Sequence, residues 1–146
     1  MNTLQRISAL FLLIITSVIT AHAAGEWIEI GEQDGERNSI YTKITTDGYR
    51  GNYVVWFLTE YQTQSVRAEV RKDAGLKRTP FSKKICIKFN SSFSEYAIVS
   101  GVFYSSKGSV IDSFEAPYED FRQIVPGTVG EGWAEAAQYV LRSYGE

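Results

Sequence analysis

The sequence predicts an α+β fold: a small antiparallel β-sheet of about five to six strands, meander-like, with one C-terminal amphipathic helix packed on a face. Short runs of β-forming residues separated by turn residues make up most of the chain after residue 23. The chain is rich in glycine and aromatic residues and has only three prolines, which suits β-structure. Near the C-terminus the spacing of apolar residues changes to the period of a helix. These observations favour a sheet with one helix over a helical bundle.

Residues 1–23 have the order of a cleaved secretory signal peptide. A short segment with one positive charge precedes an apolar run over residues 7–19, and Ala21-His22-Ala23 fits the small-x-small cleavage pattern. The apolar run is shorter than the roughly 20 residues of a membrane-spanning helix. We therefore expect cleavage after Ala23 and a single domain over residues 24–146. Ala24 follows the cleavage site where a lipid-anchored protein has Cys, so we expect neither a lipid anchor nor a membrane span.

The first half of this domain predicts three strands, over residues 27–30, 39–44 and 52–61. Asp47-Gly48 is a turn signal between the second and the third. The strand at 52–61 has large apolar side chains on both faces. Such a strand is typical of the centre of a sheet that is covered on both sides.

The second half predicts three more strands. Residues 83–89 alternate, so that Cys86 points to the face opposite the aliphatic side chains. The segment 74–80 before it reads as a loop. Residues 95–105 and 109–114 are expected to form a hairpin, and Gly101 marks a bulge or a close approach of the backbone.

Residues 115–129 contain two prolines and are expected to be irregular, and a helix follows them. Thr128 or Gly130 is the expected cap at the start of the helix. Acidic residues in its first turns and Arg142 in its last turn suit the helix dipole. The apolar stripe that needs a sheet to lie on consists of Trp133, Ala136, Ala137, Val140, Leu141 and Tyr144.

The residue inventory argues against most enzyme chemistry. His22 is the only histidine and lies in the expected signal peptide, and Cys86 is the only cysteine. Histidine-based triads and zinc sites are therefore excluded, and we expect no enzyme activity, no cofactor and no metal. Lys84 and Lys88 on the same strand face as Cys86 would favour its thiolate, but a nucleophile also needs a base and an orienting group. Whether Cys86 is buried or joins two chains by a disulfide stays open, as does a homodimer through a strand edge.

Two further motifs have a functional and a plain interpretation. Glu115, Glu119 and Asp120 could bind a hard metal ion, but exposed carboxylates in a solvated loop are far more common. The glycine-rich segment 127–132 opens a helix, where anions bind. Glu131 within it would repel a phosphate, so a simple start of the helix is favoured.

A basic cluster is the strongest candidate binding site. Eight of the fifteen basic residues lie between residues 67 and 88, opposed only by Glu69 and Asp73. One-sided charge attracts sulfated glycans, acidic protein segments or lipid headgroups. The alternative is a set of solvated strand edges, where lysine prevents aggregation. The net charge of −2 gives no case for nucleic acid. The candidate patch, expected on a basic hairpin, comprises Arg71, Lys72, Lys77, Arg78, Lys83 and Lys84.

The order of several motifs resembles the bacterial surface-adhesin protein E family. The resemblance covers essentially the whole domain and is carried by Trp27-x-x-Ile30, residues 55–61, Lys84-Ile85-Cys86, Phe103-Tyr104 and residues 124–128. It implies a small antiparallel sheet with a C-terminal helix, and attachment to host extracellular-matrix proteins. Family members commonly have a second cysteine near the C-terminus and a lipid-attachment cysteine, and this chain has neither.

From these observations we expect an exported, non-enzymatic bacterial binding protein that contacts a protein or an extracellular-matrix component. The alternative is a soluble periplasmic accessory protein that contacts an envelope partner. Its location is accordingly expected to be periplasmic, secreted or at the cell surface.

Overall fold

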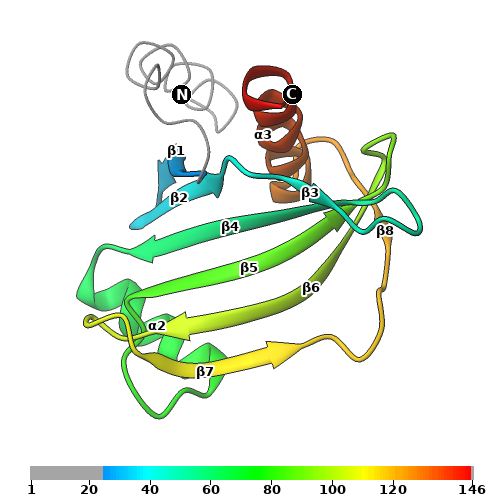
Figure 1. The fold of residues 1–146 in the computed structure, drawn as a ribbon. Helices are drawn as coiled ribbons and strands as arrows, with labels where there is room; N and C mark the ends of the chain where they lie inside the picture. Colours follow the sequence, from blue (N-terminus) through cyan, green and yellow to red (C-terminus); the bar gives the residue numbers. More distant parts are fainter. Residues whose placement is uncertain (1–24, 146) are drawn as a thin grey trace.

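The structure, a computed structural model, describes residues 25–145, so the signal peptide expected over residues 1–23 lies outside the described residues. An antiparallel sheet of eight strands is accompanied by helices α2 and α3 (Figure 1). The predicted α+β class and the C-terminal helix are confirmed. The strand count exceeds the expected five to six because two-residue strands β3 (Thr45–Thr46) and β8 (Arg122–Gln123) add to the sheet. No helix within the described residues is long and apolar enough to cross a membrane.

The longer strands follow one another in the sheet in the order β1-β2-β4-β5-β6-β7, and each is antiparallel to its neighbours. Apart from the two-residue strands β3 and β8, the spatial order is therefore the chain order, as in a meander. The bounds are β1 (Trp27–Gln33), β2 (Glu36–Tyr41), β4 (Tyr53–Tyr61), β5 (Ser82–Phe89), β6 (Glu95–Tyr104) and β7 (Val110–Glu115). β2 begins before the predicted run at 39–44 because residues 36–38 pair with both β1 and β4.

Helix α3 (Val129–Tyr144) packs its small apolar residues on one face of the sheet, which we call the helix face. Ala136 and Ala137 are fully buried there, and the Trp133 ring lies 5.8 Å from the Phe57 ring. Small side chains allow the helix axis to approach the strands closely. The strand residues of this core are Ile28, Ile30, Ile40, Val55, Phe57, Ile85, Ile87 and Phe89.

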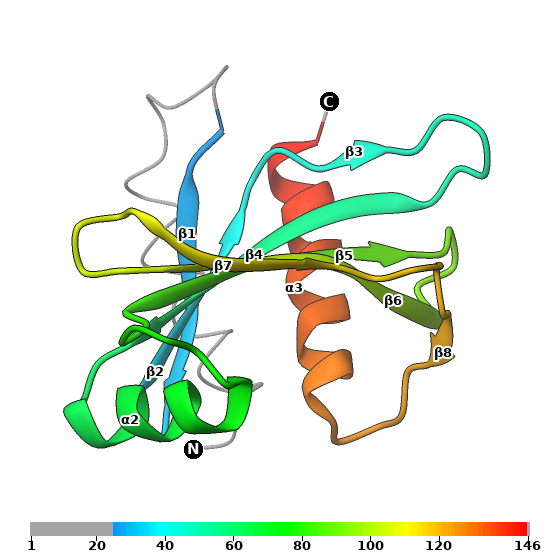
Figure 2. The same ribbon diagram turned by 90° about the horizontal axis from the view of Figure 1, so that it is seen from below.

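Helix α2 (Gln64–Ala74) occupies a segment for which the sequence predicted no helix. None of its residues is buried, so it lacks the apolar stripe by which amphipathic helices are recognised. Its ends are well defined: the Thr63 hydroxyl accepts a hydrogen bond from Val66 N at 3.2 Å. At the other end Gly75 has φ 65°, and the amides of Gly75 and Leu76 donate to carbonyls of the last turn. Figure 2 shows α2 lying to one side of the sheet, beside the ends of β4 and β5.

The opposite face of the sheet, which we call the open face, is only partly covered. Alternation along β4 places Val54, Trp56 and Leu58 on it, and all three are half-buried. The expectation that residues 52–61 are covered on both faces is therefore wrong for this side. The reason is that both described helices pack elsewhere, so cross-strand neighbours alone shield these side chains.

Cys86 lies on the open face, as its parity predicted, and is nevertheless buried as a free cysteine with 5 % of its surface exposed. It is directly opposite Trp56 of β4 in the sheet register, and a large ring at this position shields a small thiol. The interpretation of Cys86 as a small buried hydrophobic residue is the one that the structure favours.

Candidate functional site

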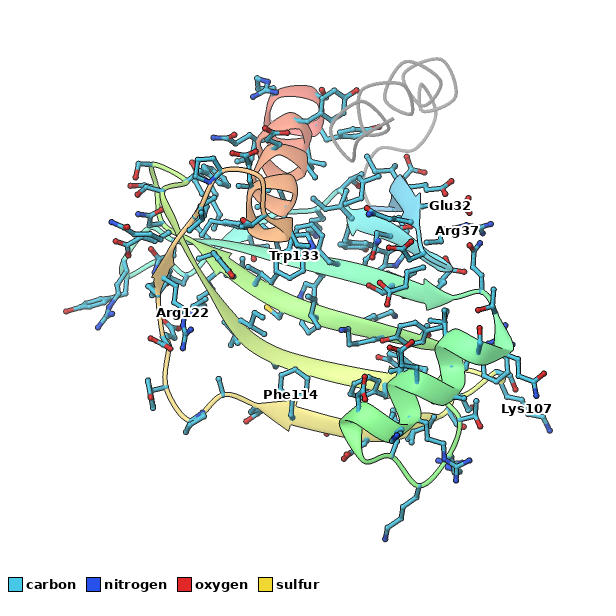
Figure 3. All side chains as sticks on the ribbon, turned by 180° about the vertical axis from the view of Figure 1, so that it is seen from behind. Glu32, Arg37, Lys107, Phe114, Arg122 and Trp133 are labelled. Atoms are coloured by element: carbon cyan, nitrogen blue, oxygen red, sulfur yellow. The ribbon has the colours of Figure 1, made fainter. Side chains whose placement is uncertain are left out.

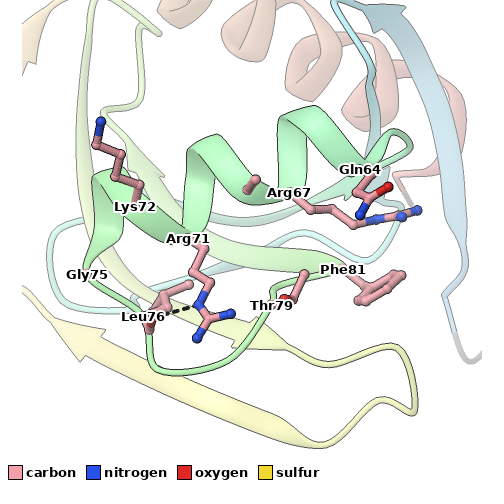
Figure 4. A pocket seen from close by; sticks show the side chains of 9 residues that line it. Gln64, Arg67, Arg71, Lys72, Gly75, Leu76, Thr79 and Phe81 are labelled. Carbon is pink, nitrogen blue, oxygen red and sulfur yellow. Dashed lines mark hydrogen bonds between the residues drawn. The ribbon is translucent and has the colours of Figure 1, made fainter.

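Helix α2 and the loop that follows it enclose a groove of about 800 Å³ (Figure 4). The helical residues along it include Arg67, Arg71 and Lys72. A spacing of four places Arg67 and Arg71 on the same side of the helix, whereas Lys72 projects from a neighbouring side. Glu69 and Asp73 do not line the groove, because the helical period turns them to the other side. The helix thereby separates the two arginines from the acidic residues with which the sequence mixes them.

The two arginines of the groove are held by backbone carbonyls. Arg71 Nε donates to Leu76 O at 3.3 Å and its Nη2 donates to Lys77 O at 2.7 Å, which closes the loop onto the helix. Arg67 Nε donates to Tyr61 O at 2.9 Å. The Arg67 guanidinium also stacks 4.1 Å above the centre of the Phe81 ring. Both cations are therefore fixed in position, which lowers the entropic cost of presenting them to a ligand.

The charge of this groove is not neutralised inside the described part of the chain. Between residues 25 and 145, the ion pairs of the structure involve Arg37, Lys88 and Arg122, and none of the groove cations. Lys72 is exposed and points away from the loop, whereas Arg71 points toward Leu76. The arrangement offers guanidinium and ammonium donors to an anionic group in solution.

The predicted basic patch is only partly brought together, and the expectation of a basic hairpin is wrong. Arg71 and Lys72 belong to α2, Lys77 and Arg78 to the loop after it, and Lys83 and Lys84 to β5. The loop is also held to β7, where Arg78 Nη2 donates to Val110 O at 2.9 Å. These six residues are close in the sequence but do not share one surface, because the segment forms a helix and a loop before strand β5.

Lys83 and Lys84 separate because successive strand residues point to opposite faces. Burial lowers the pKa of Lys83 and outweighs the opposing effect of Glu36, and this side chain is not part of an exposed patch. Lys84 lies on the open face, with its Nζ 5.5 Å from the Trp27 ring centre and 5.1 Å from that of Tyr104. Only Arg71 and Lys72 of the six predicted residues line the groove of α2.

Sequence reasoning counted Arg67 in the basic cluster but left it out of the candidate patch, and it missed Phe81 entirely. Their stacked pair forms one end of the groove. The signal for Arg67 was available in its spacing of four from Arg71, with Thr63 and Gly75 as end signals of a helix. No local signal predicts the ring of Phe81 beneath Arg67, because that contact depends on where β5 begins.

The acidic residues of the loop before α3 do not converge on one point. Glu119 pairs with Lys88, and Asp120 pairs with Arg122 at 3.0 Å. Across residues 25–145, no three side chains of the metal-ligating types form a group that could hold an ion. Each of the two carboxylates is instead engaged with its own cation.

The glycine-rich segment serves as the start of α3. Thr128 is the N-cap residue, and Glu131 Oε1 accepts a hydrogen bond from Gly127 N at 3.3 Å. A carboxylate at the start of the helix repels an approaching anion. Gly130 is buried, and a Cβ atom there would lie 3.0 Å from the Tyr96 ring. This glycine permits close packing of the helix on β6.

The Cys86 thiol is not activated. Burial raises its pKa, and the neighbouring charge of Lys88 offsets that effect only in part. The Lys88 ammonium is itself engaged by Glu119 and Asp47.

A comparison of the chain with known protein families, curated proteins and solved structures finds no match. The chemistry of the candidate site therefore rests on its own residues: fixed cations beside an aromatic ring, suited to bind anionic groups.

Proposed function

We propose that this chain is an exported, non-enzymatic binding protein that attaches to a protein or extracellular-matrix component through anionic groups of that partner. The observation that carries the proposal is the groove of α2, which is lined by Arg67, Arg71 and Lys72 and by no acidic residue. Charge of one sign over a concave surface focuses the potential and accelerates encounter with an anionic partner. The resemblance to the surface-adhesin protein E family favours a matrix component as the partner.

The proposal is tested by solid-phase binding of the purified domain to immobilised matrix proteins and to heparin. Arg67 and Arg71 hold backbone carbonyls, so reversing their charge would disturb the fold. The double variant Lys72→Glu/Lys77→Glu changes one cation that lines the groove and one on the loop beside it. Both are exposed, and in the described region neither side chain has a hydrogen bond or an ion pair. We expect its binding to fall by about tenfold and the dependence on salt to weaken.

The matched control is Lys43→Glu/Arg142→Glu, which reverses two exposed charges away from the groove. It has the same net charge as the test variant and should retain binding. An equal loss in both variants would show a general effect of net charge, and no loss in either would overturn the role of the groove.

A periplasmic accessory role is the second candidate, and the observation that favours it is in the sequence: Ala24, not Cys, follows the expected cleavage site. A lipid anchor attaches to a cysteine at that position, so this candidate role is that of a protein exported without one. Protease treatment of intact cells distinguishes the two roles. A surface protein is digested at once, whereas a periplasmic protein survives until the outer membrane is opened.

A further inference from the structure

A second groove, of about 730 Å³, lies on the open face of the sheet and does not belong to the α2 groove. Lys84 lines it, and the Lys84 ammonium lies 5.5 Å from the ring centre of Trp27 and 5.1 Å from that of Tyr104. Cation–π attraction to two rings holds this ammonium at a defined position. Three strands, β1, β5 and β6, thus contribute one aromatic and cationic cluster to the groove.

The remaining lining of this open-face groove is polar and of mixed charge. Arg37 and Glu60 come from neighbouring strands, the hydroxyls of Ser82 and Ser105 add to it, and Leu58 is an apolar member. Aromatic rings surrounded by hydroxyls, one carboxylate and cations form a surface that stacks on the C–H face of a pyranose ring and hydrogen-bonds its hydroxyls. Glu60 would repel an acidic polypeptide, whose carboxylates would also not stack on the aromatic rings of this groove.

The two grooves meet. Arg67 and Phe81 line both of them, and their stacked side chains lie 4.1 Å apart at the junction. Figure 3 shows that α2 lies across the ends of the strands, so a path along the helix leads around the sheet end. The Arg67 guanidinium is held at this junction by Tyr61 O and Gln62 O. A linear ligand can therefore follow the cations of α2 past Arg67 and reach Lys84.

We propose that the joined grooves bind one chain of a sulfated polysaccharide. Its sulfates contact Arg67, Arg71 and Lys72 on α2, and one of its sugar rings occupies the open-face groove beside Tyr104 and Lys84. The inference rests on the proposed function, since it names the anionic partner of the same groove. Charge complementarity selects the polyanion, and the aromatic rings select a saccharide over an acidic polypeptide.

The experiment measures binding of the purified domain to heparin by calorimetry at several salt concentrations, with poly-glutamate as the comparison polyanion. Tyr104→Ala is expected to weaken heparin binding about fivefold without changing the salt dependence, because a ring contact and no charge is lost. Tyr104→Phe keeps the ring and should bind as the parent does. The matched control is Tyr49→Ala, since Tyr49 is 94 % exposed and lies outside both grooves.

Lys84→Gln is the second variant, in case Tyr104→Ala does not fold. It keeps the length of the side chain, and heparin binding should weaken about threefold with a salt dependence lower by about one ion. Lys43→Gln, at an exposed residue away from both grooves, is its control.

The outcomes separate this inference from the proposed function. Loss of heparin binding in Lys72→Glu/Lys77→Glu but none in Tyr104→Ala or Lys84→Gln would overturn the saccharide subsite and leave the basic groove intact. Poly-glutamate that binds as tightly as heparin and is equally weakened by Tyr104→Ala would overturn the choice of ligand in favour of an acidic polypeptide. No binding of either polyanion by the parent protein would overturn both proposals.

Discussion

The ring of Phe114 on β7 lies directly over Gly101 of β6. The two residues are opposite one another in the register, and a Cβ atom at position 101 would lie 2.2 Å from the Phe114 ring. Gly101 has no side chain to occupy this space, so the aromatic ring fills it although 42 % of Phe114 remains exposed. The sequence predicted a bulge or a close approach of the backbone at Gly101, but what lies close to this glycine is a side chain of the edge strand.

Replacing Gly101 by Ala should lower the free energy of unfolding by about 1–3 kcal/mol, because the new methyl group overlaps the ring. Urea unfolding followed by tryptophan fluorescence measures the change. In the Phe114→Ala background the same substitution should cost little, since the ring is gone. An equal cost in both backgrounds would mean that the strain lies in the backbone and not in this contact.

Ala137 on α3 is fully buried against the sheet, and Ala137→Leu should destabilise the fold by about 1–3 kcal/mol through overpacking. The shift of the urea midpoint reports this cost. Ser143→Leu introduces the same side chain at an exposed position of the same helix and should change stability by less than about 0.5 kcal/mol. Similar effects of the two substitutions would contradict the close approach of α3.

Cys86 should react slowly with a thiol reagent in the native protein, because burial raises its pKa and limits access. The rate of labelling at neutral pH should rise by at least about tenfold in denaturant. On non-reducing electrophoresis the native protein should run without a disulfide-linked dimer. A dimer band that disappears in Cys86→Ala would show that two chains do join at this residue.

Asp47 should make the stability depend on acid pH. Desolvation acts to raise its pKa, but hydrogen bonds from the amides of Asn52 and Arg50, together with the Lys88 charge, outweigh it and lower the pKa. A depressed pKa in the folded state gives stability that is present above the ordinary pKa of Asp, about 3.9, and is lost as the pH falls through the folded value. Asp47→Asn should therefore flatten the loss of stability below about pH 4.

The comparison for Asp47 is Asp34→Asn, a carboxylate in the exposed turn between β1 and β2. Its unfolding curves at pH 7 and at acid pH should follow those of the parent protein. If Asp47→Asn shows the same pH dependence as the parent, the hydrogen bonds to Asn52 and Arg50 do not stabilise the charged form.

Much of the fold was predictable because its signals are local. The alternation along residues 83–89 correctly assigned Ile85 and Ile87 to one face and Cys86 to the other. The helical spacing of Ala136, Ala137 and Val140 correctly gave the buried side of α3. Helix α2 escaped this reasoning because Val66 and Val70 alone do not make an apolar stripe, so only its capping residues signalled it.

The candidate site was predictable in its composition but not in its shape. The cluster of cations between residues 67 and 88 is plain in the sequence, yet the helix turns Glu69 away and strand alternation separates Lys83 from Lys84. The open-face cluster had no sequence signal, since Trp27, Lys84 and Tyr104 are distant in the chain and meet only across paired strands.

By itself the sequence determined the α+β class, the meander order of the strands and the absence of histidine after residue 22. These features follow from residue identity and from side-chain periodicity over a few residues. Only the tertiary structure decided that Arg67 stacks on Phe81 and that two grooves meet there. Such contacts depend on strand register and on where α2 lies, both of which are set by packing between distant segments and not by local preference.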